Sequence, residues 1–232
     1  MIESDIYGCY EAIRKGSHSF YAASKLLPKP VRDPAVVLYA FCRIADDNVD
    51  DKDASQDAID LLRERLELAY QGTPKNLPVD RAFASLVDIC KMPRALPDAL
   101  LEGLEWDSLN LRFETLSDLH SYSARVASAV GVMMCVIMNV RDKDVLARAC
   151  DLGAAMQLTN IARDIGEDAM NNRFYIPKSL LDKHCLKPKI KNFGEISDFK
   201  KMCAEMASIN HNLYKEAFSK LPQKEYSRQR VG

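Results

Sequence analysis

Carboxylates gather in the stretch YAFCRIADDNVDD, which carries four aspartates directly after an apolar run. On a helix, Asp46 and Asp50 are four residues apart and project from one face, where like charges repel. Such a pair is either solvated or neutralised by cations. A calcium loop of the EF-hand type does not fit, because no glycine stands at its sixth position and no glutamate at its twelfth. The stretch alone leaves a solvated helix end and a metal site as alternatives.

A second polar stretch, GAAMQLTNIARDIGED, begins at Gly153 and ends at Asp168. Its polar positions recur every three or four residues, which places them in one stripe along a helix. They are Gly153, Gln157, Asn160, Asp164, Glu167 and Asp168. An apolar stripe of Leu158, Ala162, Ile165 and Ala169 runs beside them. Because a solvated stripe normally carries lysine and this one has none, we interpret it as the lining of a polar cavity.

The oxygen ligands of both stretches suit Mg²⁺ or Mn²⁺ and not zinc. Mg²⁺ usually takes one or two carboxylates and completes its octahedron with water and substrate phosphates. The two stretches together therefore predict a phosphate or diphosphate substrate. Arg43, Arg163 and Arg173 are candidates for neutralising the diphosphate oxygens. The chemistry expected of such a site is ionisation of a C–O bond, with the metal stabilising the leaving diphosphate.

Helices must position these residues, because helical spacing dominates the chain and glycine, at nine residues, is sparse. We predict helices over residues 4–26, 33–50, 54–71, 79–91, 96–110, 116–138, 143–170 and 196–219. Asp33 before Pro34 predicts one helix start, and Thr115 or Ser117 another. The predicted fold class is all-α, with the helices packed around a common interior.

Composition excludes several functional classes. The 232 residues carry a net charge of −1, which gives no indication of nucleic-acid binding. The longest apolar run is far short of the roughly 20 residues that span a bilayer. Seven scattered cysteines without a C-x-x-C pair indicate reduced thiols in a cytoplasmic protein. The four histidines are far apart in sequence, which argues against a histidine-based metal centre.

Several segments resemble the squalene/phytoene synthase family, which joins two isoprenoid diphosphates head to head. They are HSFYAASKLLP (18–28), LYAFCRIADDNVDD (38–51), LLEGLEWD (100–107), YSARVASAVGVMM (122–134) and LGAAMQLTNIARDIGEDAMNNRFYIP (152–177). They follow the family's order and spacing from about residue 17 to residue 221. QLTNIARDIGED is the most specific of these signals, and the combination with RFYIP is most similar to the phytoene-forming bacterial members.

The resemblance implies a role for each matching residue. Magnesium ligands would be Asp46, Asp50, Asn160, Asp164 and Asp168, of which the four aspartates are the catalytic candidates. Diphosphate would be held by Arg43 and Arg163, and substrate by His18, Ser19, Phe20, Tyr21, Tyr39 and Gln157. Arg173 and Tyr175 are further substrate-binding candidates or simply close a helix end. Tyr122, Val126 and Gly131 would border the prenyl cavity. Plain packing is the alternative for Gly131 and for the three aromatic residues at positions 20, 21 and 39.

The implied reaction is Mg²⁺-dependent condensation of two geranylgeranyl diphosphates, through prephytoene diphosphate, to phytoene, a step of carotenoid biosynthesis. The alternatives are a condensing enzyme of the squalene or dehydrosqualene type that uses C15 substrates, and a non-catalytic assembly protein. The family implies an isoprenoid-synthase-type helical bundle around a central cavity. We expect a single domain over residues 1–232 that lacks the family's last helices. The expected partner is a prenyl diphosphate substrate, without nucleic acid. The expected location is the cytoplasm, with peripheral contact at the inner face of the membrane.

Overall fold

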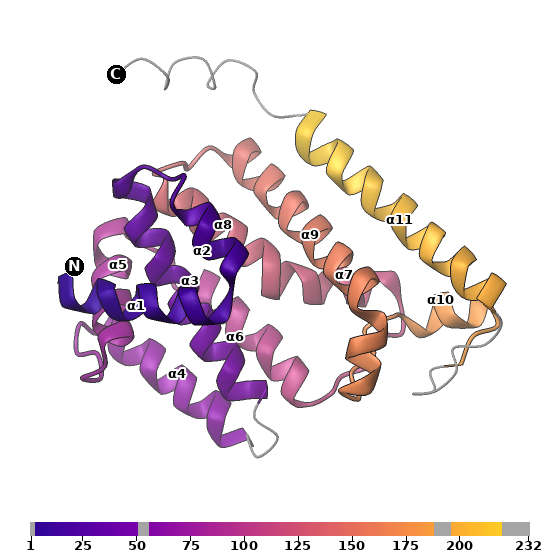
Figure 1. Cartoon of the computed structure of the whole chain (residues 1–232), viewed down its shortest axis with the longest axis horizontal. Helices are drawn as coiled ribbons and strands as arrows, with labels where there is room; N and C mark the ends of the chain where they lie inside the picture. Colours follow the sequence, from indigo (N-terminus) through magenta and orange to yellow (C-terminus); the bar gives the residue numbers. More distant parts are fainter. Residues whose placement is uncertain (1–2, 51–55, 188–195, 220–232) are drawn as a thin grey trace. The chain divides into compact units, whose positions relative to one another are not determined.

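The computed structural model of the chain describes residues 3–50, 56–187 and 196–219 (Figure 1). All regular elements in these ranges are helical, which confirms the predicted all-α fold class. They are α1 (Glu3–Gly16), α2 (His18–Ser24), α3 (Lys29–Asp50), α4 (Gln56–Tyr70), α5 (Pro78–Cys90), α6 (Ala95–Ser108), α7 (Leu116–Ser123), the π-helical η1 (Ala124–Ser128), α8 (Ala129–Ile137), α9 (Lys143–Met170), α10 (Lys178–Lys183) and α11 (Ile196–Ser219). Within these ranges, none of the helices is both long and apolar enough to cross a bilayer.

The chain divides into two compact units. The first unit comprises Met1–Leu109 and Met133–Val140, and the second comprises Asn110–Val132 and Arg141–Gly232. The first acidic stretch therefore lies in the first unit and the second in the other. The single domain over residues 1–232 and its central cavity stay predictions.

α3 forms the centre of the first unit, where α1, α5 and α6 pack against it. The Phe41 ring of α3 stacks on Phe83 of α5, with ring centroids 3.8 Å apart. Beside this core, Arg65 of α4 holds Asp80 of α5 by a bidentate ion pair whose shortest contact is 2.6 Å. The Asp80 side chain is 4% exposed. Because a buried carboxylate is costly without a partner, this pair ties the position of α4 to that of α5.

α9 forms the centre of the second unit, with η1 and α7 against it and α11 running along it (Figure 1). Thr115 caps α7 in a reciprocal capping box with Asp118, which confirms one of the two predicted caps. The predicted helical run over 116–138 is also confirmed, with the π-helical η1 in its middle. π-helical segments are frequent at functional sites.

One predicted helix is broken in two, and one predicted helix start is wrong. The predicted helix over 4–26 is broken at Ser17, whose extended backbone ends α1 and whose hydroxyl accepts the Phe20 N–H to start α2. The third helix begins at Lys29 and not after Asp33, so Pro34 lies inside it. Asp33 does not cap the helix. Its carboxylate accepts a hydrogen bond from the Tyr10 hydroxyl at 2.8 Å.

α10 lies between two predicted helices, in a stretch for which the sequence predicted no helix. Its first amides donate to backbone carbonyls far away in the chain: Lys178 N–H to Phe113 O at 2.9 Å and Ser179 N–H to Glu114 O at 3.0 Å. A helix of six residues is marginal by itself, so these long-range bonds and the burial of Leu180 and Leu181 stabilise it.

Candidate active site

The predicted polar stripe of the second acidic stretch lies on α9, beside a buried apolar face. Leu158, Ile161 and Ile165 are at most 7% exposed, which fixes the rotation of the helix in the second unit. On the polar side, Asn160 is exposed and Asp164 is half-buried. Gln157 and Asp168 are half-buried, and Glu167 is exposed. The stripe therefore presents amide and carboxylate oxygens on an accessible face, and the predicted lining of a polar cavity stays a prediction.

Asp164 is held by its chain neighbour Arg163. The guanidinium donates two parallel hydrogen bonds, Nε to Oδ1 and Nη2 to Oδ2, each 2.6 Å long. These bonds, assisted by the positive charge, hold the pKa of Asp164 below its usual range. The carboxylate therefore stays ionised, which is the state that a metal ligand needs. Because both of its oxygens face Arg163, a cation that binds Asp164 must share or displace the guanidinium.

Gly153 allows α9 to approach η1 closely. A Cβ atom at this position would lie 2.7 Å from the Ser128 Cα and 2.8 Å from the Ala127 carbonyl oxygen, both backbone atoms. One turn away, the Ser128 hydroxyl donates to the Cys150 carbonyl at 2.6 Å. Gly131 is a similar case, because its Cβ would lie 3.0 Å from the Ala149 carbonyl oxygen. The contact at Gly131 favours its packing interpretation. Together the two glycines allow α9 to lie close to the backbone of η1 and α8.

A Schellman motif at the end of α9 brings Arg173 back to Asp168. Asn172 adopts the left-handed conformation with φ 61°. Its N–H donates to the Ala169 carbonyl, and the Arg173 N–H donates to the Asp168 carbonyl at 2.7 Å. The chain then turns back along the apolar face of α9. The two asparagines of NNRFYIP thus place Arg173 and Tyr175 beside the acidic stripe.

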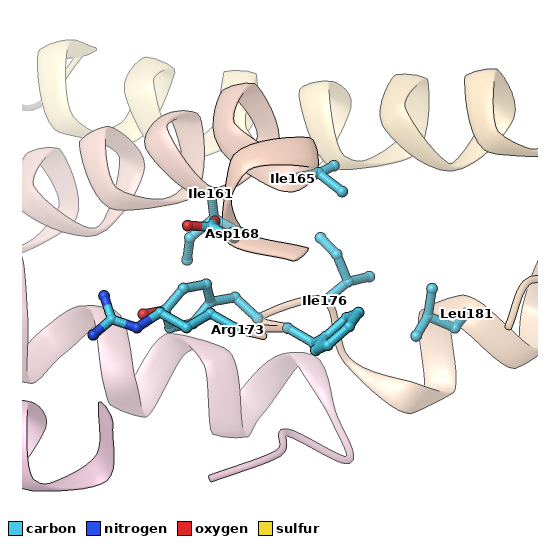
Figure 2. A pocket seen from close by; sticks show the side chains of 8 residues that line it. Ile161, Ile165, Asp168, Arg173, Ile176 and Leu181 are labelled. Atoms are coloured by element: carbon cyan, nitrogen blue, oxygen red, sulfur yellow. The ribbon is translucent and has the colours of Figure 1, made fainter. Parts of the chain in front are cut away.

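A small, partly open pocket, with enclosed room for about one water molecule, lies between α9 and this returning segment (Figure 2). Its walls are largely apolar, with a carboxylate and a guanidinium at their edge. Figure 2 shows Ile161, Ile165 and Asp168 on α9, and Arg173 and Ile176 on the segment that follows it. The lining residues are Ile161, Ile165, Asp168, Arg173, Phe174, Tyr175, Ile176 and Leu181. The lining thus brings apolar walls next to one negative and one positive side chain.

Aromatic rings pack against the 173–176 segment that follows α9. Tyr175 lies 5.3 Å from the Tyr122 ring and 6.3 Å from the Phe113 ring, centroid to centroid. Tyr122, predicted to border a prenyl cavity, is buried in this cluster. The Arg112 guanidinium lies 4.0 Å from the centre of the Phe174 ring, and partial burial lowers the pKa of Arg112. These contacts hold the 173–176 segment against α9.

In the first unit, α1, α2 and α3 bring together several predicted substrate-binding residues. The Phe20 and Tyr39 rings lie 5.7 Å apart. Gly16 leaves room for Tyr39 and Arg43, since a Cβ there would lie 2.7 Å from the Tyr39 hydroxyl and 3.3 Å from the Arg43 side chain. Phe20 is 55% exposed, so the alternative of a plain core aromatic does not describe it. The arrangement leaves an aromatic and a guanidinium side by side on α3.

The remaining predicted site residues have fewer described contacts. His18 is exposed, and the Tyr21 ring lies under Lys25, whose Nζ is 4.3 Å from the ring centroid. Val126 lies in η1 and is half-buried. Asp46 and Asp50 belong to the last turn and a half of α3, four residues apart as predicted, but their side chains, like that of Ser19, lie outside the described residues.

The metal prediction can be tested against the donors on α9. Within the described part of the chain, no three histidine, cysteine or carboxylate side chains converge as a metal site. α9 itself offers Asn160, Asp164 and Asp168, an oxygen-only set with a partly exposed carboxylate. This set fits a hydrated Mg²⁺ that takes few protein ligands, and it does not fit zinc.

A profile of the squalene/phytoene synthase family matches residues 13–231. The chain belongs to this family. Two relatives are phytoene synthases, from Cereibacter sphaeroides and Rhodobacter capsulatus, each 55% identical to this chain. The matches extend over 193 and 190 residues and cover 79% and 81% of the chain, but 54% and 56% of the relatives. The chain thus spans about half the length of these relatives.

Among solved structures, a dehydrosqualene synthase in complex with ligand superimposes with a TM-score of 0.85. It is 34% identical to this chain, and the match covers 94% of the chain and 77% of that structure. The predicted family and its helical fold are therefore confirmed. The assignment of individual site residues stays a prediction.

Sequence reasoning missed part of the pocket. Phe174 stands within the RFYIP motif and its aromatic type was a usable signal. Leu181 gave no such signal, because it lies outside the predicted helices. Arg112 gave none either, because it comes from a segment far from α9 in sequence and only the fold brings it to the Phe174 ring.

Proposed function

We propose that this chain catalyses the Mg²⁺-dependent head-to-head condensation of two geranylgeranyl diphosphates to phytoene, through prephytoene diphosphate. The observation that carries the proposal is the oxygen-only stripe on α9, with Asp164 kept ionised by Arg163, next to an apolar pocket. The 55% identity to two phytoene synthases supports the choice of reaction and substrate.

The proposed magnesium ligands are Asp46, Asp50, Asn160, Asp164 and Asp168. Magnesium, when bound, would supply the positive charge that stabilises the departing diphosphate. Both acidic helices contribute ligands in this proposal, and Arg43 and Arg163 bind diphosphate oxygens. The bidentate pair between Arg163 and Asp164 is suited to an exchange of partners, in which Asp164 binds magnesium and Arg163 binds diphosphate. When Asp164 turns to a cation, the guanidinium needs a new bidentate acceptor, and the oxygens of diphosphate offer one.

The apolar walls protect the reaction from water. Loss of diphosphate from an allylic substrate leaves a carbocation that water would quench. Ile161, Ile165 and Ile176 line the pocket with aliphatic carbon directly beside Asp168 and Arg173. In the proposal, these side chains hold the prenyl chain next to the reacting carbon, and Arg173 stays near the anionic end. Phe20, Tyr39 and Gln157 are proposed to contact substrate from their helices.

One alternative reaction has a specific observation in its favour. The dehydrosqualene synthase structure resembles the whole described fold, so a C15 substrate, farnesyl diphosphate, is the second candidate. The chemistry and the proposed ligands are the same for both. Only the length of the prenyl chain that the pocket admits differs.

Product analysis tests the proposal. The purified chain is incubated with labelled geranylgeranyl or farnesyl diphosphate and Mg²⁺, with and without EDTA, and the extracted lipids are identified by mass. We expect EDTA-sensitive phytoene from the C20 substrate. A C30 product alone would transfer the proposal to the second candidate. Absence of product from either substrate, with a folded chain shown by circular dichroism, would reject catalysis by this chain.

A further inference from the structure

Gly16 stands at a position whose backbone does not require glycine. It is the last residue of α1, and its φ is not positive, so an alanine could adopt the same conformation. The residue is also exposed, and glycine is disfavoured in a helix relative to alanine. The space beside Gly16, and not its conformation, therefore accounts for the glycine.

Two side chains of α3 fill that space. A Cβ atom at Gly16 would lie 2.7 Å from the Tyr39 hydroxyl oxygen and 3.3 Å from both Cγ and Cδ of Arg43. Because nonbonded carbon atoms attract best at about 3.5–4.0 Å, both side chains would have to move away from such a Cβ. Tyr39 and Arg43 are four residues apart and share one face of α3. The absent side chain of Gly16 thus allows both of them to lie against the end of α1.

Several contacts hold the end of α1 in place, so the helix cannot withdraw to make room for a larger residue. Ile13 is 2% exposed in the core of the first unit, and the Tyr10 hydroxyl ties α1 to Asp33 of α3. The Ser17 N–H donates to the Ile13 carbonyl at 2.9 Å, and the Ser17 hydroxyl caps α2. The atoms that can give way are the far ends of the two α3 side chains. An added methyl group would therefore displace these side chains and leave the helices in place.

We infer that Gly16 is a positioning residue for diphosphate binding, because its missing side chain fixes where the Tyr39 hydroxyl and the Arg43 side chain lie. The inference rests on the proposed function, in which Arg43 binds diphosphate oxygens and Tyr39 contacts substrate. A guanidinium binds phosphate through directed, often bidentate hydrogen bonds, and a misplacement of about 1 Å in such a site can cost about 100-fold in rate. Gly16 acts through the two α3 side chains and not by a contact of its own with substrate.

Calorimetric binding of inorganic diphosphate to the full chain, in the presence of Mg²⁺, tests this role. Gly16→Ala should raise the Kd roughly 10-fold, because the displaced guanidinium loses part of its charge-assisted hydrogen bonding. Tyr39→Phe removes the atom that the new Cβ approaches most closely. In the Tyr39→Phe background, Gly16→Ala should therefore change the Kd by less than about 3-fold, since effects of residues in contact are not additive. The far-ultraviolet circular dichroism of each variant should equal that of the wild type.

The matched control is Gly8→Ala, the same substitution on the same helix. A Cβ at Gly8 would lie 3.0 Å from the Pro78 Cβ of α5, so it presses on another element of the first unit. Gly8→Ala should bind diphosphate as the wild type does. Equal affinity of Gly16→Ala and the wild type, an equal loss in Gly8→Ala, or no binding by the wild type would each overturn the inference. An undiminished loss in the Tyr39→Phe background would also overturn it.

Product analysis on the same preparations separates this inference from the proposed function. Diphosphate binding with the expected loss in Gly16→Ala, but no phytoene from the wild type, would reject the proposed reaction alone. Phytoene from the wild type, with unchanged diphosphate affinity in Gly16→Ala, would reject the role of Gly16 alone.

Discussion

The close approach of α9 to η1 predicts that two glycines of the same helix respond oppositely to alanine. At Gly153 the new Cβ would lie within 3 Å of three backbone atoms of residues 127 and 128, which cannot rotate away. Overpacking of this kind costs about 1–3 kcal/mol. Alanine gains about 1 kcal/mol over glycine in a helix interior. The helix-propensity gain offsets part of the overpacking cost. Because the new Cβ meets three backbone atoms, we take the upper part of the cost range, and Gly153→Ala should lower the free energy of unfolding by about 1–2 kcal/mol.

Gly166 is the matched control, because it lies on the same helix and a Cβ there meets nothing within 4 Å. Gly166→Ala should raise the free energy of unfolding by up to about 1 kcal/mol through helix propensity alone. Urea unfolding followed by far-ultraviolet circular dichroism measures both. For a chain of this size, each kcal/mol corresponds to a shift of about 2–4 °C in Tm. A Gly153→Ala variant as stable as Gly166→Ala would refute the argument that backbone contact fixes the depth of α9.

Two further predictions concern ion pairs. Asp80→Ala leaves the Arg65 guanidinium without its bidentate partner at a nearly dry site, so the free energy of unfolding should fall by about 3–5 kcal/mol in urea titrations. A loss no larger than that of the exposed-pair variant Lys91→Ala would show that the Arg65 site is wetter than the structure indicates. Arg163→Gln should raise the pKa of Asp164 into its usual range, which an NMR titration of the labelled carboxyl measures. Because the folded pKa lies below the unfolded value, the stabilisation by this pair is complete above about pH 4 and is lost as the pH falls through the folded pKa. An unchanged pKa in Arg163→Gln would contradict the assigned cause.

The long, strongly periodic elements could be predicted from the sequence. The predicted range of α9, residues 143–170, agrees with the structure, because Asp142 caps its start and Asn171 ends it. Its apolar stripe runs beside its polar stripe, as predicted, since Ile165 and Asp168 line the same pocket. Local chemistry was sufficient there, since capping, periodicity and side-chain type all indicate the same helix.

Long-range contacts explain the parts that could not be predicted. α10 is stabilised by carbonyls of Phe113 and Glu114, more than sixty residues earlier in the chain, which no local pattern contains. The break at Ser17 was missed because the apolar pattern continues through it, while its hydroxyl starts a new helix. The return of Arg173 to Asp168 depends on a left-handed asparagine, and NN by itself does not specify the side on which the chain returns.

The role of Asp164 in Mg²⁺-dependent loss of diphosphate tests the central claim most directly. Release of inorganic diphosphate from geranylgeranyl diphosphate is measured against Mg²⁺ concentration for the wild type, Asp164→Asn and Asp182→Asn. Asp182 is the matched control, an exposed aspartate of the same unit that pairs with Lys178 at 2.6 Å and lies outside the stripe. We predict that Asp164→Asn lowers the rate roughly 100-fold or more, while Asp182→Asn keeps the wild-type rate and Mg²⁺ dependence. A wild-type rate in Asp164→Asn would contradict the account.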